Sequence, residues 1–259
     1  MADLLQVSGL TKRFGGLTAV NNVSFDVREK EILSVIGPNG AGKSTLFKLI
    51  ASFLKPTSGE VLFKGERISS LAPHIAARKG VVRTFQETTI FRNMSVRDNV
   101  IIAHHLRSRA GLLGFYFGTA LARRDEAEFG SSADGILAFL GLSSIAGETA
   151  LNLPHGHLRA LSIAIGLATS PSILLLDEPF AGMNHDETMK AVAMVSSLRA
   201  RGLTVLLVEH DMPAVMKISD RIVVLNFGEK IAEGTPSEIQ RNERVIEAYL
   251  GSEDETIGL

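Results

Sequence analysis

Apolar and polar residues alternate in two early stretches, 4–7 and 23–27, which is the pattern of half-buried strands. Short apolar runs predict further strands at 31–36, 60–63, 173–176 and 203–208, and a strand pair at 222–225 and 230–233 around Gly228. Helical periodicity covers 44–53, 186–199 and 212–218. Strands and helices that alternate in this order predict an α/β fold with a mostly parallel sheet.

Between 87 and 154 strand signals are nearly absent and helical signals dominate. Ser95 followed by Asp98 is a helix-start signal close to a capping box. Helices are expected over 95–106, 125–140 and 158–169. We interpret this region as a helical subdomain inserted into the α/β core. The predicted organisation is a core over 1–86, a helical subdomain over 87–157, the continued core over 158–251 and a frayed acidic tail over 252–259.

Composition narrows the class of protein. The chain has 259 residues, a hydrophobic share of 45% and a charged share of 21%, which excludes wholesale disorder. A formal net charge of -1 argues against a nucleic-acid-coating protein. Zero Cys removes disulfides, thiolate nucleophiles and Cys-based metal sites. No apolar run approaches the roughly 20 residues of a spanning helix, and the first five residues lack a basic signal-peptide region, so neither is expected.

The segment Gly37–Ser44 matches the phosphate-binding P-loop pattern, between a predicted strand and a predicted helix. Its glycines let backbone N–H groups face phosphates, and the helix N-terminus adds partial positive charge. Lys43 can reach the β- and γ-phosphates, Ser44 can bind Mg²⁺ and Thr45 can contact the α-phosphate. The alternative is a Gly-rich turn without a ligand, which both flanks disfavour. The predicted contacts are Gly37, Pro38, Asn39, Gly40, Ala41, Gly42, Lys43, Ser44 and Thr45.

A second motif is the carboxylate pair Asp177-Glu178, which ends the apolar run 173–176. Asp177 is placed to hold Mg²⁺ directly or through water, and Glu178 to polarise the water that attacks the γ-phosphate. Taken alone, the pair is a weak signal, and the alternative interpretation is a polar strand end that caps the next helix. Downstream of a P-loop it favours nucleotide hydrolysis.

From residue 5 to residue 251 the chain resembles the ATP-binding cassette (ABC) ATPases. The resemblance implies a P-loop NTPase core with an N-terminal antiparallel β subdomain and an inserted helical subdomain. It also implies ATP and Mg²⁺ as cofactors, Phe14 stacked on adenine and Val20 as a further nucleotide contact. Gln86 matches the glutamine that senses Mg²⁺ and the attacking water, and His210 the switch histidine at the γ-phosphate. Asn184 stands where many relatives carry Asp.

Within the family, the chain is most similar to ATPase subunits of branched-chain (hydrophobic) amino-acid importers. The likeness rests on segments 14–20, 83–86, 181–184, 208–212, 231–236 and 248–251, and on a long helical stretch between 106 and 139. It implies a second cassette, two transmembrane permease subunits, indirectly a substrate-binding protein, a place at the cytoplasmic face of the inner membrane, and no nucleic acid. Urea or amide importers, a lipopolysaccharide-type exporter and a weakly catalytic regulatory subunit remain alternatives.

The signature motif departs from the family pattern. Leu153, Pro154, His155, Gly156 and His157 occupy its place, and only Leu153 and Gly156 fit. The signature closes over nucleotide held by the partner cassette, and Pro154 lacks the hydroxyl and N–H of the usual serine. Two interpretations stay open: drift within the family, or a pair with one fast and one slow site. A metal site at the two histidines is disfavoured because no Cys or carboxylate cluster is near.

The family likeness implies that the segment 87–94 contacts a membrane subunit, and Phe91 and Met94 are apolar residues in it that could make this contact. A second apolar cluster comprises Leu112, Leu113, Phe115, Tyr116 and Phe117. Packing inside the helical subdomain is the alternative for both groups.

Overall fold

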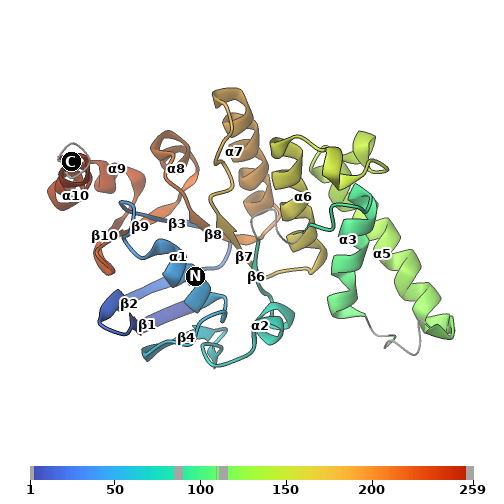
Figure 1. Ribbon diagram of the computed structural model, residues 1–259, viewed down its shortest axis with the longest axis horizontal. Helices are drawn as coiled ribbons and strands as arrows, with labels where there is room; N and C mark the ends of the chain where they lie inside the picture. The colour runs from blue at the N-terminus through green and yellow to red at the C-terminus, as the bar shows by residue number, and fades with distance from the viewer. Residues whose placement is uncertain (1–2, 85–89, 109, 111–115, 255–259) are drawn as a thin grey trace. The chain divides into compact units, whose positions relative to one another are not determined.

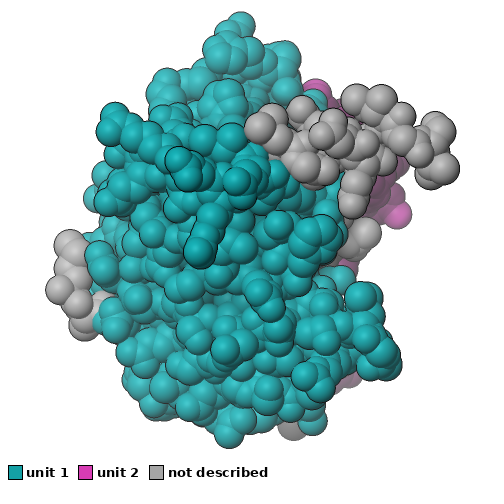
Figure 2. Space-filling model, turned by 90° about the vertical axis from the view of Figure 1, so that its left-hand side faces the viewer, with its two compact units in different colours: residues 1–76, 172–259 teal, residues 77–171 magenta. Residues whose placement is uncertain are grey.

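The computed structural model describes residues 3–84, 90–108, 110 and 116–254. The chain divides into two compact units, which Figure 2 distinguishes by colour. The first comprises Met1–Ala76 and Ser172–Leu259, and the second Ala77–Pro171. The chain therefore leaves the first unit and returns to it, as expected for an inserted subdomain.

An antiparallel sheet forms from the first part of the first unit. Its strand order is β2-β1-β4-β5, with β1 Asp3–Phe14, β2 Leu17–Arg28, β4 Ser58–Phe63 and β5 Glu66–Arg67. β1 continues well past the predicted end at Val7. Its register against β2 shifts between Val7 and Leu10, around Gly9 with φ of +56°, which disrupts the simple alternation.

The second sheet of this unit is mainly parallel, with strand order β10-β9-β3-β8-β7 (Figure 1). The strands are β3 Ile32–Ile36, β7 Ile173–Asp177, β8 Thr204–Val208, β9 Arg221–Asn226 and β10 Glu229–Gly234. All residues of β3, β7 and β8 are buried, which explains their continuous apolar sequences. β9 and β10 pair antiparallel around Gly228, as predicted.

Helices complete this unit: α1 Lys43–Ile50, α7 His185–Ala200, α8 Met212–Ile218, α9 Pro236–Gln240 and α10 Glu243–Asp254. Asn184 begins α7 through a reciprocal capping box with Glu187, and Asp211 caps α8 at Ala214 N. Val245 of α10 is buried in a cluster with Ile36, Val224 and Ile239. α10 extends to Asp254 and so includes the first residues of the acidic tail expected over 252–259, whereas 255–259 lie outside the described residues.

The second unit contains α3 Val96–His104, α5 Ala120–Phe139 and α6 His155–Ala168, joined by short 3₁₀ turns such as His105–Arg107, Ser143–Ile145 and Ala150–Asn152. Ser95 caps α3 by accepting a hydrogen bond from Asp98 N, as predicted. Two short elements, α2 Pro73–Lys79 and β6 Val81–Arg83, had no clear sequence signal.

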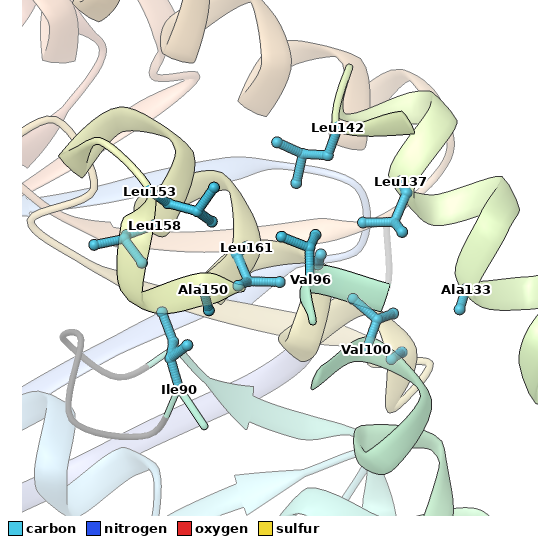
Figure 3. Packing of buried hydrophobic residues seen from close by; sticks show 12 residues of the cluster. Ile90, Val96, Val100, Ala133, Leu137, Leu142, Ala150, Leu153, Leu158 and Leu161 are labelled. Atoms are coloured by element: carbon cyan, nitrogen blue, oxygen red, sulfur yellow. The ribbon is translucent and has the colours of Figure 1, made fainter. Parts of the chain in front are cut away.

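Apolar residues of α3, α5 and α6 form one core (Figure 3). Leu158 and Leu161 of α6 gather there with Val96, Val100 and Leu137. The unit therefore runs to Pro171, wider than the 87–157 expected, because α6 buries its apolar face against the helices that precede it.

Candidate nucleotide site

Three neighbouring strands of the parallel sheet end at the same level. Val35 of β3 lies opposite Val208 of β8, and Val208 lies opposite Asp177 of β7. The segments that follow these strands are the phosphate loop, Glu178 and the Glu209-His210 pair. Register therefore brings three sequence-predicted motifs to the carboxyl edge of one sheet, where ligands bind in open α/β folds.

Glycine is required in the phosphate loop by close backbone approach. A Cβ on Gly37 would lie 2.1 Å from the carbonyl oxygen of Leu225, and one on Gly42 would lie 2.3 Å from that of Ala19. Gly42 also has a φ of +96° and serves as the N-cap of α1. The loop is thus packed between β2 and the end of β9, and the residues after Gly42 form the first turn of α1.

Lys43 is buried inside the loop. Its ammonium donates hydrogen bonds to the carbonyl oxygens of Gly37 at 2.6 Å and Pro38 at 2.9 Å. Burial lowers the pKa of Lys43, while the charges of Glu178 and Asp177 act in the opposite direction. The lysine and both predicted carboxylates therefore belong to one electrostatic site.

The two carboxylates differ in backbone conformation. Asp177 is the last residue of β7 and is buried. Glu178 has a φ of +48°, a left-handed conformation that costs a non-glycine residue on the order of 1–3 kcal/mol. Its N–H donates to the carbonyl oxygen of Val208 at 2.9 Å, which holds the turn against β8. Glu178 is thus fixed at the strand edge by its main chain.

His210 follows β8 and presents its ring outward. Its side chain is 62% exposed, and Nδ1 lies 3.7 Å from Oε2 of the buried Glu209. Oε2 of Glu209 also accepts a hydrogen bond from the N–H of His210 at 2.9 Å. The His210 ring is therefore available to a ligand at this edge, while the buried Glu209 carboxylate holds the His210 backbone in place.

The two residues predicted to face the nucleoside differ in exposure. Phe14, at the end of β1, is 46% exposed, and the ammonium of Lys12 lies 5.1 Å from its ring centroid. Val20 is completely buried in β2. Phe14 can therefore offer a ring face to a base, whereas the Val20 side chain lies within the core.

Other predicted site residues belong to the second unit or lie outside the described residues. Pro154 is the N-cap of α6, Leu153 is buried in the helical core, and His155, Gly156 and His157 form the first turn of α6. Phe91 is 53% exposed and Met94 is half-buried. Gln86, Leu112, Leu113 and Phe115 lie outside the described residues, whereas Tyr116 and Phe117 are strongly exposed and stack edge to face.

The donor set at the strand edge suits a small hard cation bound together with phosphates. Ser44 supplies a hydroxyl and Asp177 a carboxylate, which are the oxygen ligands used for Mg²⁺ in nucleotide sites. Among the described residues, no three His, Cys, Asp or Glu side chains are grouped to hold a metal on their own. A cation here would therefore depend on nucleotide oxygens.

Two contacts beside the site had no sequence prediction. Glu209 directly precedes His210 and is 1% exposed, so an acid straight after a wholly apolar strand was the only available signal. Tyr249 on α10 makes a hydrogen bond with the backbone of Gly37, and burial raises its pKa to about 12. The sequence offers no indication of that contact because the two residues are far apart along the chain.

The described fold and site define a P-loop nucleotide-binding domain. A family model described as ABC transporter matches residues 20–181, and one described as Branched-chain amino acid ATP-binding cassette transporter matches residues 229–255. The chain therefore belongs to the ATP-binding cassettes of ABC transporters and is an ABC ATPase.

Named relatives agree. The high-affinity branched-chain amino acid transport ATP-binding protein BraF of Pseudomonas aeruginosa is 47% identical over 249 residues, which cover 96% of this chain and 98% of the relative. LivG of Escherichia coli K12, with the same description, is 46% identical with the same coverage. The lipopolysaccharide export system ATP-binding protein LptB of Haemophilus influenzae is 31% identical, with coverage of 97% and 98%.

Solved structures show the same fold. An ATP-binding cassette of an ABC transporter in its ADP conformation has a TM-score of 0.86 at 31% identity, covering 97% of this chain and all of that one. A nucleotide-free cassette has a TM-score of 0.84 at 30% identity, covering 96% and 99%. No helix among the described residues has the length and apolar content needed to cross a bilayer.

Proposed function

We propose that this chain hydrolyses ATP to power uptake of branched-chain or other hydrophobic amino acids through partner membrane subunits. The observation that carries the proposal is the 46–47% identity, over nearly the whole length, to ATP-binding proteins of branched-chain amino acid transport. The family model over 229–255 supports the same substrate class. The lipopolysaccharide-export relative is more distant, at 31% identity.

The proposed roles follow from the strand-edge geometry. Loop N–H groups and Lys43 bind the phosphates, and Thr45 contacts the α-phosphate. Phe14 stacks on adenine through its exposed face. Glu178 polarises the attacking water and His210 contacts the γ-phosphate. Gln86 is proposed to sense the metal and the water.

Mg²⁺ is proposed at Ser44 and Asp177, with Gln86 as a third contact. When bound, it neutralises phosphate charge and orients the γ-phosphate. The chain's own contribution is the placement of Lys43 among Asp177 and Glu178, whose charges oppose the lowering of the lysine pKa by burial. These two negative charges favour the protonated form of the lysine, which is the form that attracts phosphates.

We propose that the chain acts in a pair of cassettes with two membrane permease subunits, supplied by a separate substrate-binding protein. Leu153–His157 of each cassette then closes over nucleotide bound by its partner. Exposed Phe91 is the proposed contact for a membrane subunit at the cytoplasmic face of the membrane.

The test is purification of the complex from native membranes, identification of its subunits, and measurement of ATP hydrolysis and leucine uptake in proteoliposomes. We expect ATP-dependent uptake, and we expect Glu178→Gln to bind ATP while losing hydrolysis by roughly 100-fold or more. Urea uptake, lipid export, or hydrolysis equal to wild type in the variant would contradict the proposal.

A further inference from the structure

Glu209 is a carboxylate that the proposed chemistry does not use, and its environment is specific. It follows β8 directly and is 1% exposed. Burial raises the pKa of Glu209, and hydrogen bonds from three backbone amides lower it. Burying a carboxylate is costly unless its oxygens are hydrogen-bonded, and here both oxygens accept bonds.

The three donors come from two different segments. Oε1 accepts from the N–H of Phe180 at 2.7 Å. Oε2 accepts from the N–H of His210 at 2.9 Å and of Asp211 at 3.4 Å. One side chain therefore links the turn after Glu178 to the turn that carries His210.

Each of the two linked segments leads into a helix and is held there by its own hydrogen bonds. The turn after Glu178 is closed by the N–H of Ala181, which donates to the carbonyl oxygen of Glu178 at 3.3 Å, and it ends where Asn184 caps α7. The His210 turn ends where Asp211 caps α8 by accepting from Ala214 N at 3.0 Å. Glu209 thus connects the turn that carries Glu178 and leads into α7 with the turn that carries His210 and leads into α8.

We propose that Glu209 is a positioning residue that couples the 178–184 turn to His210, so that the two move as one body during ATP hydrolysis. The proposal rests on the proposed ATPase function of this edge. The carboxylate itself contacts no reacting atom. Its effect is to hold the main chain of His210, whose ring remains 62% exposed, at a fixed distance from the turn that bears Glu178.

A general role in stability is the competing explanation, and Glu31 provides a matched control. Glu31 is also a buried carboxylate whose pKa is raised by burial. It accepts from Arg28 N at 2.8 Å and from Arg221 Nη2 at 3.0 Å, just before β3 and therefore at the opposite end of that strand from the phosphate loop. Loss of either carboxylate should lower stability, whereas only Glu209 touches the hydrolytic segments.

The test compares Glu209→Gln and Glu31→Gln with wild type in the assembled transporter. In glutamine, the carbonyl oxygen can still accept from one segment, but the NH2 group that replaces the second oxygen cannot accept from the other. One of the two linked segments is therefore released. We expect kcat of Glu209→Gln to fall roughly tenfold with the Kd for ATP within about twofold, because the loss concerns hydrolysis rather than binding. Glu31→Gln should keep kcat while the complex is folded.

Amide hydrogen exchange supplies a readout that does not depend on turnover. In Glu209→Gln, exchange should accelerate in one or both of the linked segments, 180–184 and 210–214, and in Glu31→Gln in neither. An unchanged kcat in Glu209→Gln, or a loss of kcat that merely follows thermal stability in both variants, would overturn the positioning role. Absence of ATP hydrolysis by the wild-type complex would instead refute the proposed function.

Discussion

The Cα of Gly37 lies against the carbonyl oxygen of Leu225, so that a Cβ at residue 37 would stand 2.1 Å from that oxygen. Gly37→Ala must displace either the phosphate loop or the end of β9. We expect ATP affinity to fall roughly tenfold or more and stability by about 1–3 kcal/mol. Nucleotide titration and urea unfolding measure the two effects.

Gly65→Ala is the matched control for this change. Gly65 also has a positive φ, +78°, but a Cβ there would meet nothing within 4 Å. It should lose about 1 kcal/mol of stability and keep its ATP affinity. Equal affinity losses in both variants would show that general destabilisation, and not the contact between residue 37 and Leu225, lowers ATP affinity.

Tyr249→Phe removes only the hydroxyl that is hydrogen-bonded to the backbone of Gly37. The ring stays packed in the cluster that contains Ile36 and Val245. We expect ATP affinity to fall roughly two- to tenfold, with about 1 kcal/mol lost in stability. Tyr116→Phe, at a strongly exposed tyrosine, should change neither quantity. Unaltered affinity in Tyr249→Phe would mean that the hydroxyl does not support the loop.

Phe91→Glu tests the proposed contact with a membrane subunit. Asn99 holds the backbone of Phe91 through bonds of 2.8 Å to its N–H and 3.0 Å to its carbonyl oxygen, so the exposed ring can be replaced without losing that support. We expect uptake to fall at least about tenfold while stability changes by less than about 0.5 kcal/mol. Ile246→Glu, at a comparably exposed residue of α10, is the control and should transport normally.

We expect His104 to make the helical unit less stable in acid. It is buried, it stacks on Phe129 with ring centroids 5.3 Å apart, and its Nε2 has no hydrogen-bond partner among the described residues. Burial, and secondarily the charge of His105, lowers its pKa below the ordinary 6.5. Below pH 6.5 the unfolded chain takes up a proton that the folded chain does not, so stability falls until the folded pKa is passed.

The measurement is urea unfolding between about pH 7.5 and about pH 5.5, in wild type and in His104→Leu. The wild type should lose stability toward acid relative to the variant, in which this proton uptake is absent. His185→Gln, at an exposed histidine of α7, should follow the wild type. Parallel pH curves for wild type and His104→Leu would exclude His104 as the cause.

Pro154→Ser separates the two explanations of the unusual signature segment. Pro154 is the N-cap of α6 and makes no side-chain cap hydrogen bond. A serine can accept from the first-turn amides, which should add about 1 kcal/mol to the stability of the helical unit. If the proline creates a slow site in an asymmetric pair, ATP turnover of the complex rises as well. Unchanged turnover with increased stability would leave family drift as the explanation.

The features predicted most clearly from the sequence are those that depend on residues close together along the chain. Continuous apolar runs became the fully buried strands β3, β7 and β8, and the glycine spacing became the phosphate loop. Their convergence follows from parallel register, because adjacent strands end together. The pattern that predicts each of these elements therefore lies within a few consecutive residues.

Long-range packing was not predictable in this way. The burial of Val20, the assignment of α6 to the helical unit and the bonds of Glu209 all depend on residues brought together by folding. The helix α10, which continues to Asp254, was not predicted from the sequence. Each of these required the tertiary structure.

The phosphate loop near the start of the chain is supported by residues near its end. Gly228 N donates to the carbonyl oxygen of Ala41 at 3.1 Å, and the N–H of Asn21 donates to the carbonyl oxygen of Gly228 at 2.8 Å. The shape of the phosphate loop is therefore a long-range property of the first unit, because it depends on the turn between β9 and β10 as well as on the loop's own glycines.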